Sequence, residues 1–356
     1  NDGKVGGERS FQIKRGDLTI GDEIRAGSVN VSLDNGRLTV AGTIDASGER
    51  VGSIRLAGKH GVTLAGTAVL DAHGSVLRVD SYGKIIDAPN RALIEINAGD
   101  GVLALDSGAR LDVRHGTAAG SGADKGRHDG KARGTLDLHA ARLGSAGGAS
   151  DADAATHGDI AIAAGAGLRI EGAREIAVHG TARYSDAPQG VLKDVSGQVV
   201  PGPDGLPQAD LAAGGRPYRY IDQAYLDSKH GDSTDFMAAA LGNANLLENK
   251  LAGLRTAALA EALHVRPGVE IVTQGDLVVS GDIDLSAHRY AGLNAKAPKT
   301  AVAGSGEPGS LVLRAGGNLD IFGSINDGFA PPPATPDDTG WVLTPGRQAS
   351  GAVVVV

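Results

Sequence analysis

The sequence contains no cysteine and few aromatic side chains, with 4 Phe, 6 Tyr and 1 Trp among its 356 residues. The missing cysteine excludes disulfides and thiolate metal sites, and it is compatible with export as an unfolded chain. Aromatic rings normally supply much of the buried area of a globular core. A core built without them must rely on small aliphatic side chains, which suits a narrow interior between closely stacked strands.

Long apolar runs and basic stripes are also missing. No apolar run reaches the roughly 18 residues that a membrane-spanning helix needs, and no signal peptide opens the sequence. The net charge of −8 argues against binding to a phosphate backbone, because no cluster of cations is available to release counterions. We therefore expect no membrane-spanning segment and no nucleic-acid partner. Both ends of the chain read as mid-strand, so we expect it to be part of a longer protein.

What the sequence does have is 55 glycines and many short alternating apolar segments. The clearest stretch covers residues 265–329, where apolar pairs are separated by Gly, Asn or Asp. Alternation at every second residue is typical of half-buried strands, and the intervening residues favour turns. No segment is long enough to close a globular sheet, so the pattern predicts a stack of short strands. The apolar pairs are Val269 with Ile271, Leu277 with Val279, Ile283 with Leu285, Leu311 with Leu313, and Leu319 with Ile321.

The same pattern of short apolar strands and turn residues repeats in the first half of the chain. Residues 38–48 form one unit of strand, glycine turn and strand, and a copy follows roughly 25 residues later at 62–74. Repeats of this period with Gly, Asn and Asp corners predict a right-handed parallel β-helix (β-solenoid), the hand being taken from the general crossover rule. We expect an all-β fold with Gly-rich loops and one mainly α-helical insertion.

Composition divides the chain into three expected parts. Residues 1–184 are predicted to form β-helix coils with loop excursions near 116–133 and 144–156. Residues 185–264 are predicted to form a Pro-rich loop followed by a helical insertion, with a helix start at 232–235 and a break near 242–243. Residues 265–356 are expected to resume the coils.

Three segments of the second half carry a family resemblance: HGDSTDFMAAALGN (230–243), LRTAALAEALHVRPGVEIVTQGDLVVSGDIDLSAHRY (254–290) and GSLVLRAGGNLDIFGSINDGF (309–329). Together they resemble the filamentous haemagglutinin-like exoproteins, the large β-helical adhesins that Gram-negative bacteria export by two-partner secretion. The resemblance implies a secreted or outer-surface location and an outer-membrane transporter as partner. It also implies a host-cell or polysaccharide receptor, which the sequence does not specify.

Aspartates recur after Ile or Leu throughout the chain, at Asp45, Asp71, Asp87, Asp112, Asp137, Asp284 and Asp320. Carboxylates on neighbouring coils could bind Ca²⁺ or form an acid/base pair. They follow the repeat uniformly, however, whereas a catalytic cluster would be concentrated in a few coils. We interpret them as residues that leave each strand outward and bond local backbone N–H groups. The ten histidines are scattered without ligand spacing, so we predict no catalytic residue, no cofactor and no metal site.

Four of the six tyrosines gather around the insertion: Tyr218, Tyr220, Tyr225 and Tyr290. They are the candidate contact surface, because exposed aromatic rings can bind carbohydrate or a receptor. The alternative, which we favour, is that the rings pack and pin the insertion against the coils.

Three functions fit these observations. The first is a non-enzymatic segment of a surface-exposed or secreted adhesin, acting in virulence by adhesion to host cells, surfaces or other bacteria. The second is the delivery stick of a contact-dependent growth inhibition toxin, which a C-terminal effector domain would reveal. The third is a polysaccharide-active β-helix enzyme, which incubation with uronate polymers would reveal.

Overall fold

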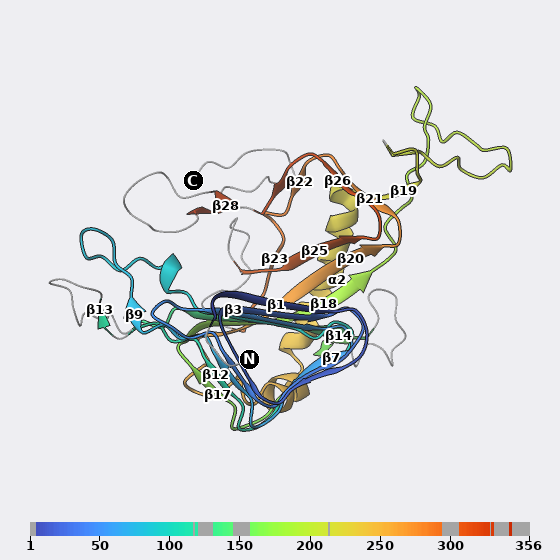
Figure 1. The fold of residues 1–356 in the computed structure, drawn as a ribbon. Helices are drawn as coiled ribbons and strands as arrows, with labels where there is room; N and C mark the ends of the chain where they lie inside the picture. The colour runs from blue at the N-terminus through green and yellow to red at the C-terminus, as the bar shows by residue number, and fades with distance from the viewer. Residues whose placement is uncertain are drawn as a thin grey trace. The chain divides into compact units, whose positions relative to one another are not determined.

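The protein consists mainly of β-strands in parallel sheets, with few helices, and belongs to the all-β class (Figure 1). The computed structural model describes residues 5–116, 118–119, 131–144, 157–212, 214–293, 306–327, 329–330 and 342–343. The predicted loops at 116–133 and 144–156 lie mostly outside these ranges. No helix within the described residues is long and apolar enough to cross a membrane.

Contacts within the chain define two compact units. Unit 1 comprises residues 1–181, 237–266 and 292–296, and unit 2 comprises residues 182–236, 267–291 and 297–356. The boundary between the two units at residues 181/182 lies close to the boundary that composition predicts at residues 184/185. Residues 237–264, which composition assigned to the insertion, belong to unit 1.

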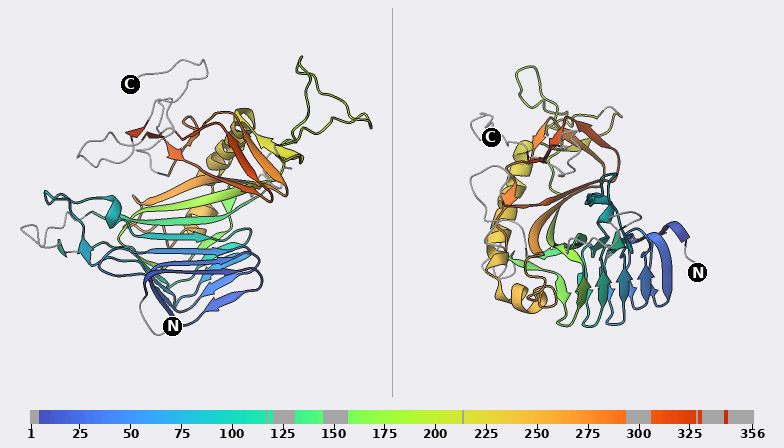
Figure 2. Two further views of the ribbon diagram at one scale, coloured as in Figure 1. Left: turned by 45° about the horizontal axis from the view of Figure 1, so that its top comes forward. Right: turned by 90° about the vertical axis from the view of Figure 1, so that its left-hand side faces the viewer.

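Unit 1 is built on a row of parallel strands that pair in register. β3 (Glu23–Leu33), β6 (Ser53–Gly58), β10 (Leu93–Asn97), β14 (Gly134–Leu143) and β18 (Ala173–Tyr184) follow one another, and β1 (Val5–Ile13) lies beside β3 (Figure 2). Along this row, Val29 faces Ile54, Ile54 faces Ile94 and Ile94 faces Leu136. The chain therefore returns to the same register each time it adds a strand.

Two further rows repeat the same order. One contains β2 (Leu18–Ile20), β4 (Leu38–Val40), β7 (Gly61–Leu64), β11 (Val102–Leu105) and β16 (Ile162–Ala164). The other contains the first residues of β3, then β5 (Thr43–Asp45), β8 (Val69–Asp71), β12 (Arg110–Asp112) and β17 (Arg169–Glu171). Leu38 pairs with Val62 and Ile44 with Leu70, which confirms that the sequence repeat corresponds to neighbouring paired strands.

The core of unit 1 lies on the inward face of these strands. In β14, Leu136, Leu138 and Ala140 are buried, and the residues between them are partly exposed. This alternation is what the period of a strand requires.

The turns between the rows also repeat, and turns on neighbouring strands adopt the same backbone conformation. Gly108 and Gly167 both have positive φ, at 97° and 103°, and the Gly108 N–H donates to the Gly167 carbonyl at 3.2 Å. Glycine adopts this conformation without the steric cost of a Cβ atom.

Unit 2 repeats the strand pattern with a longer spacing. β20 (Leu263–Thr273, of which residues 267–273 belong here) pairs with β25 (Ser310–Ala315), and β21 (Asp276–Ser280) lies between β19 (Tyr218–Ile221) and β26 (Leu319–Phe322). β22 (Ile283–Asp284) pairs with β27 (Ile325–Asn326). The predicted apolar pairs are thus aligned, with Ile271 facing Leu313 and Leu277 facing Leu319.

The helix starts earlier than the sequence predicted. α2 spans Gln223–Leu241, so the predicted start at 232–235 was wrong. The structural reason is Asp222, whose Oδ1 accepts the Tyr225 backbone N–H at 2.9 Å and caps the first turn. The predicted break near 242–243 is confirmed, because α2 ends there and a π-helix follows at Asn245–Lys250.

Candidate functional sites

Four of the seven recurring aspartates cap local turns. Oδ1 of Asp45, Asp71, Asp112 and Asp284 each accepts the backbone N–H two residues further on, at 2.9, 3.1, 3.2 and 3.0 Å. This is the local backbone bonding that the sequence predicted. Asp45 and Asp112 make these turn bonds while buried, at 6% and 0% exposed.

Arginine side chains neutralise Asp45 and Asp112, the two buried aspartates of this recurring set. Asp45 accepts Arg25 Nε at 2.9 Å, and Asp112 accepts Arg114 at 2.5 Å and Arg110 at 3.2 Å. Burial by itself raises the pKa of Asp112, but the hydrogen bonds and charge of Arg114 outweigh it and hold that pKa below its ordinary value. Asp112 therefore stays ionised in an ion-pair network, which is a stabilising arrangement and leaves no acid for proton transfer.

Two of the predicted contact tyrosines are held by aspartates in unit 2. Tyr218 donates its hydroxyl to Asp210 at 2.8 Å, and Tyr225 donates to Asp186 at 2.7 Å. Burial and the neighbouring carboxylate raise the pKa of Tyr218 to about 12. Lys229 Nζ lies 4.7 Å from the centre of the Tyr225 ring and 2.7 Å from Asp186, so Tyr225 is part of a packed cluster.

The other two tyrosines differ in exposure. Tyr220 lies on β19 and is partly exposed. Tyr290 is 4% exposed and its ring packs against His230 at 5.1 Å, which removes it from any outer surface. The structure therefore places the four tyrosines in different surroundings, and Tyr218 and Tyr220 are the ones that remain candidates for contact.

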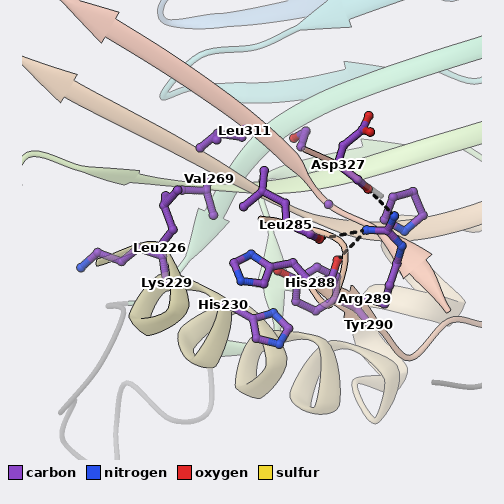
Figure 3. Close-up of a pocket in the computed structure, with 13 residues that line it drawn as sticks. Leu226, Lys229, His230, Val269, Leu285, His288, Arg289, Tyr290, Leu311 and Asp327 are labelled. Atoms are coloured by element: carbon purple, nitrogen blue, oxygen red, sulfur yellow. Dashed lines mark hydrogen bonds between the residues drawn. The ribbon is translucent and has the colours of Figure 1, made fainter. Parts of the chain in front are cut away.

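A pocket in unit 2 is a candidate ligand cavity (Figure 3). Its volume is about 260 Å³. Leu226, Val269, Leu285 and Leu311 supply apolar walls, and side chains from α2 and β20 face one another across it. Apolar walls with a few polar groups are the usual composition of a small-ligand cavity.

The polar groups of this pocket are already engaged. His288 Nε2 lies 3.0 Å from Asp227 Oδ1, and its ring stacks on His230 at 4.4 Å. The Arg289 guanidinium donates to the backbone carbonyls of Leu285, His288 and Asp327, at 3.4, 3.1 and 2.7 Å (Figure 3). Burial lowers the pKa of Arg289. These contacts fix the pocket wall, and they do not form a nucleophile with an adjacent base.

A third constellation lies in unit 1, on the face of β14 and β18 opposite the core. Nε2 of His139 and Nε2 of His179 lie 3.2 and 2.9 Å from the same oxygen, Asp137 Oδ1. His139 faces His179 in the strand register, and the two rings stack at 4.4 Å with an angle of 8° between their planes. Two imidazoles and one carboxylate are a donor set that divalent transition metals accept.

The sequence analysis did not predict this cluster, because it treated the histidines as scattered and expected no metal site. The pattern that indicates the cluster combines strand alternation with the pairing register of the strands. Asp137 and His139 are two residues apart and so share one face of a strand, and His179 occupies the same position in the next strand of the row.

A second group of this type, Asp71, His73 and Asp112, is occupied differently. His73 Nδ1 contacts Asp71 at 2.6 Å, and the Asp112 carboxylate is taken by the two arginines described above. The cations that a metal would supply are already present there as guanidinium groups.

Comparison of the chain with protein-family models, with curated proteins and with solved structures found no match.

Proposed function

We propose that the chain is a segment of the right-handed parallel β-helix of a filamentous haemagglutinin-like exoprotein, and that it acts in adhesion. The observation that carries the proposal is the repeated register of unit 1, in which each row receives one strand per passage of the chain. The hand follows from the general preference of parallel crossovers. The role in adhesion is proposed from the resemblance of residues 230–329 to this family.

The mechanism is geometric. Each coil adds about 4.8 Å of length, so repetition carries contact surfaces away from the cell. Excursions from the coils supply those surfaces. The excursion at 185–217 in unit 2 is held together by antiparallel bridges such as Val191 with Ala209 and Lys193 with Val199. It exposes a set of apolar side chains: Leu192, Val195, Val199, Leu206 and Leu211.

This excursion is the surface to which we assign contact with host cells, surfaces or other bacteria. Val195 and Leu206 are 110% and 64% exposed, and apolar side chains gathered at such exposure are typical of interaction surfaces. Tyr218 and Tyr220 follow directly in the chain and would extend the same surface. In line with the family resemblance, we assign the protein to the outer surface or the secreted fraction, with an outer-membrane transporter as its export partner.

A cell-binding assay tests the proposal. The labelled chain is incubated with epithelial cells and with Gram-negative bacteria, beside a β-helical protein of similar net charge. We expect the chain to bind more than this reference, and the double variant Val195→Ser/Leu206→Ser to lose binding at an unchanged melting temperature. The control variant Val102→Ser changes an exposed valine of unit 1 and should bind normally. Binding no greater than the reference on every surface would contradict the proposal.

A further inference from the structure

The Asp137, His139 and His179 constellation carries an inference that the adhesin proposal does not use. Its three side chains come from neighbouring strands of one sheet, so the backbone pairing of β14 with β18 fixes their positions. A site on paired strands is held more precisely than one on a loop.

The ligand atoms are spaced as a single ion requires. The candidate donor atoms of the three residues all lie within 4.8 Å of one another. With bonds of roughly 2.0–2.1 Å to nitrogen and oxygen, a tetrahedral zinc ion separates neighbouring donor atoms by about 3.3 Å. The observed distances from Asp137 Oδ1 to the two Nε2 atoms, 3.2 and 2.9 Å, are close to this separation. Small side-chain rotations would complete the geometry.

Burial without hydrogen bonds is the second observation. His179 is 6% exposed, and its Nδ1 has no hydrogen-bond partner. Asp137 Oδ1 is also buried, and its contacts with the two imidazoles lack hydrogen-bond geometry. Leaving buried polar atoms unsatisfied costs about 1–3 kcal/mol each. A cation between the carboxylate oxygen and the imidazole nitrogens would remove this penalty for Oδ1.

The electrostatics of the three side chains are compatible with a cation. A carboxylate oxygen and two imidazole nitrogens are donors that zinc-class ions accept. Arg266, a cation whose charge acts on His179, is paired with Glu175 at 2.6 Å, so its charge is compensated.

We propose that Asp137, His139 and His179 bind one divalent transition-metal ion of the zinc class. The site supplies three protein ligands and leaves a fourth position for water. The Asp137 side chain is one third exposed, at 33%, so the ion can enter from its side. The ion would join two neighbouring strands of the row and stabilise the folded state.

Metal titration of the purified chain tests this inference. Co²⁺ is added first, because its visible absorption reports coordination by nitrogen and oxygen, and Zn²⁺ is then used to displace it. We expect about one equivalent to bind and the melting temperature of unit 1 to rise with Zn²⁺. His139→Gln and Asp137→Asn should each weaken binding at least about tenfold, since each removes a ligand. His179→Gln is a third test and is read only together with the apo melting temperature, because that side chain is buried.

The matched control is His73→Gln, which removes a histidine from the other Asp/His group and should change the affinity less than twofold. Equal losses in His73→Gln and His139→Gln would overturn the assignment, as would wild-type protein that takes up neither ion at micromolar concentration. Zinc X-ray absorption showing fewer than two imidazoles would overturn it as well. Each of these outcomes is independent of adhesion, so this site and the proposed function can fail separately.

Discussion

At the scale of single residues, the ladder of carboxylates explains why aspartate recurs after each apolar strand. Asp45 faces Asp71, and Asp71 faces Asp112, in the register of β5, β8 and β12. Like charges on neighbouring strands repel. The turn N–H groups that all three carboxylates accept offset this repulsion, as do the arginines beside Asp45 and Asp112.

Removing the charge of Asp112 should therefore destabilise unit 1. Asp112→Asn keeps the turn hydrogen bond but loses the charge-assisted bonds to Arg110 and Arg114, and we expect a loss of about 1–2 kcal/mol in the free energy of unfolding. Urea denaturation measures it. Asp71→Asn is the control, because Asp71 makes the same turn bond and contacts His73 in place of an arginine. A cost for Asp71→Asn equal to that for Asp112→Asn would contradict the role given to the arginines.

Asp45 and Asp112 also make the stability of unit 1 depend on pH. Burial raises the pKa of Asp45, but Ser47 and Arg25 outweigh it and the net shift is downward, as for Asp112. The folded state then binds fewer protons than the unfolded state near the ordinary carboxyl pKa. Their stabilisation should be complete above about pH 5 and should be lost as the pH falls through about 4 toward the folded pKa values. Denaturation midpoints across this range measure it, and Asp112→Asn should flatten the curve.

Glycine at the matched turns provides a second residue-scale test. Gly108 and Gly16 have similar φ angles, 97° and 94°, but a Cβ atom on Gly108 would lie 2.9 Å from the Gly66 carbonyl oxygen, whereas one on Gly16 meets nothing within 4 Å. Gly16→Ala should cost about 1–2 kcal/mol from backbone strain alone. Gly108→Ala should cost measurably more in the same denaturation assay. Equal costs would show that the neighbouring turn gives way.

At the scale of elements, alternation predicted the paired strands of residues 269–285 and 311–321 correctly, because inward and outward residues differ in character. Ile94 and Glu95 on β10 are one example, and Ile271 on β20 is another. The predicted helix start was wrong because Asp222, the capping residue, precedes a segment whose apolar pattern is weak. The Asp137 constellation was missed because it depends on which strands become neighbours, and loops of different length separate them.

A substitution in β10 tests the packing of the stacked rows. Ile94 is fully buried and faces Ile54 on one side and Leu136 on the other, so Ile94→Ala should cost about 2–5 kcal/mol. Glu95→Ala, on the opposite face of the same strand, should cost less than about 1 kcal/mol, since its partner Arg55 is exposed. A similar cost for both variants in chemical denaturation would contradict the assignment of the two faces.

At the scale of the whole molecule, the proposed β-helix requires regular addition of strands to each row of unit 1. One ladder of outward residues records this directly in the second row: Thr19, Thr39, Thr63, Ala104 and Ala163, each facing the next. They are separated by very different lengths of chain. Only regular stacking would space them evenly.

Distances between spin labels on this ladder test whether the strands stack regularly. Because the chain has no cysteine, pairs of introduced cysteines take the label only at the chosen positions. Labels at Thr19 and Thr63, Thr19 and Ala104, and Thr19 and Ala163 should be separated by backbone spans of about 10, 14 and 19 Å, each increased by the length of the label. Regular stacking predicts a constant increment near 4.8 Å for each added strand. Distances that do not increase in this order, or that scale with the length of intervening chain, would contradict it.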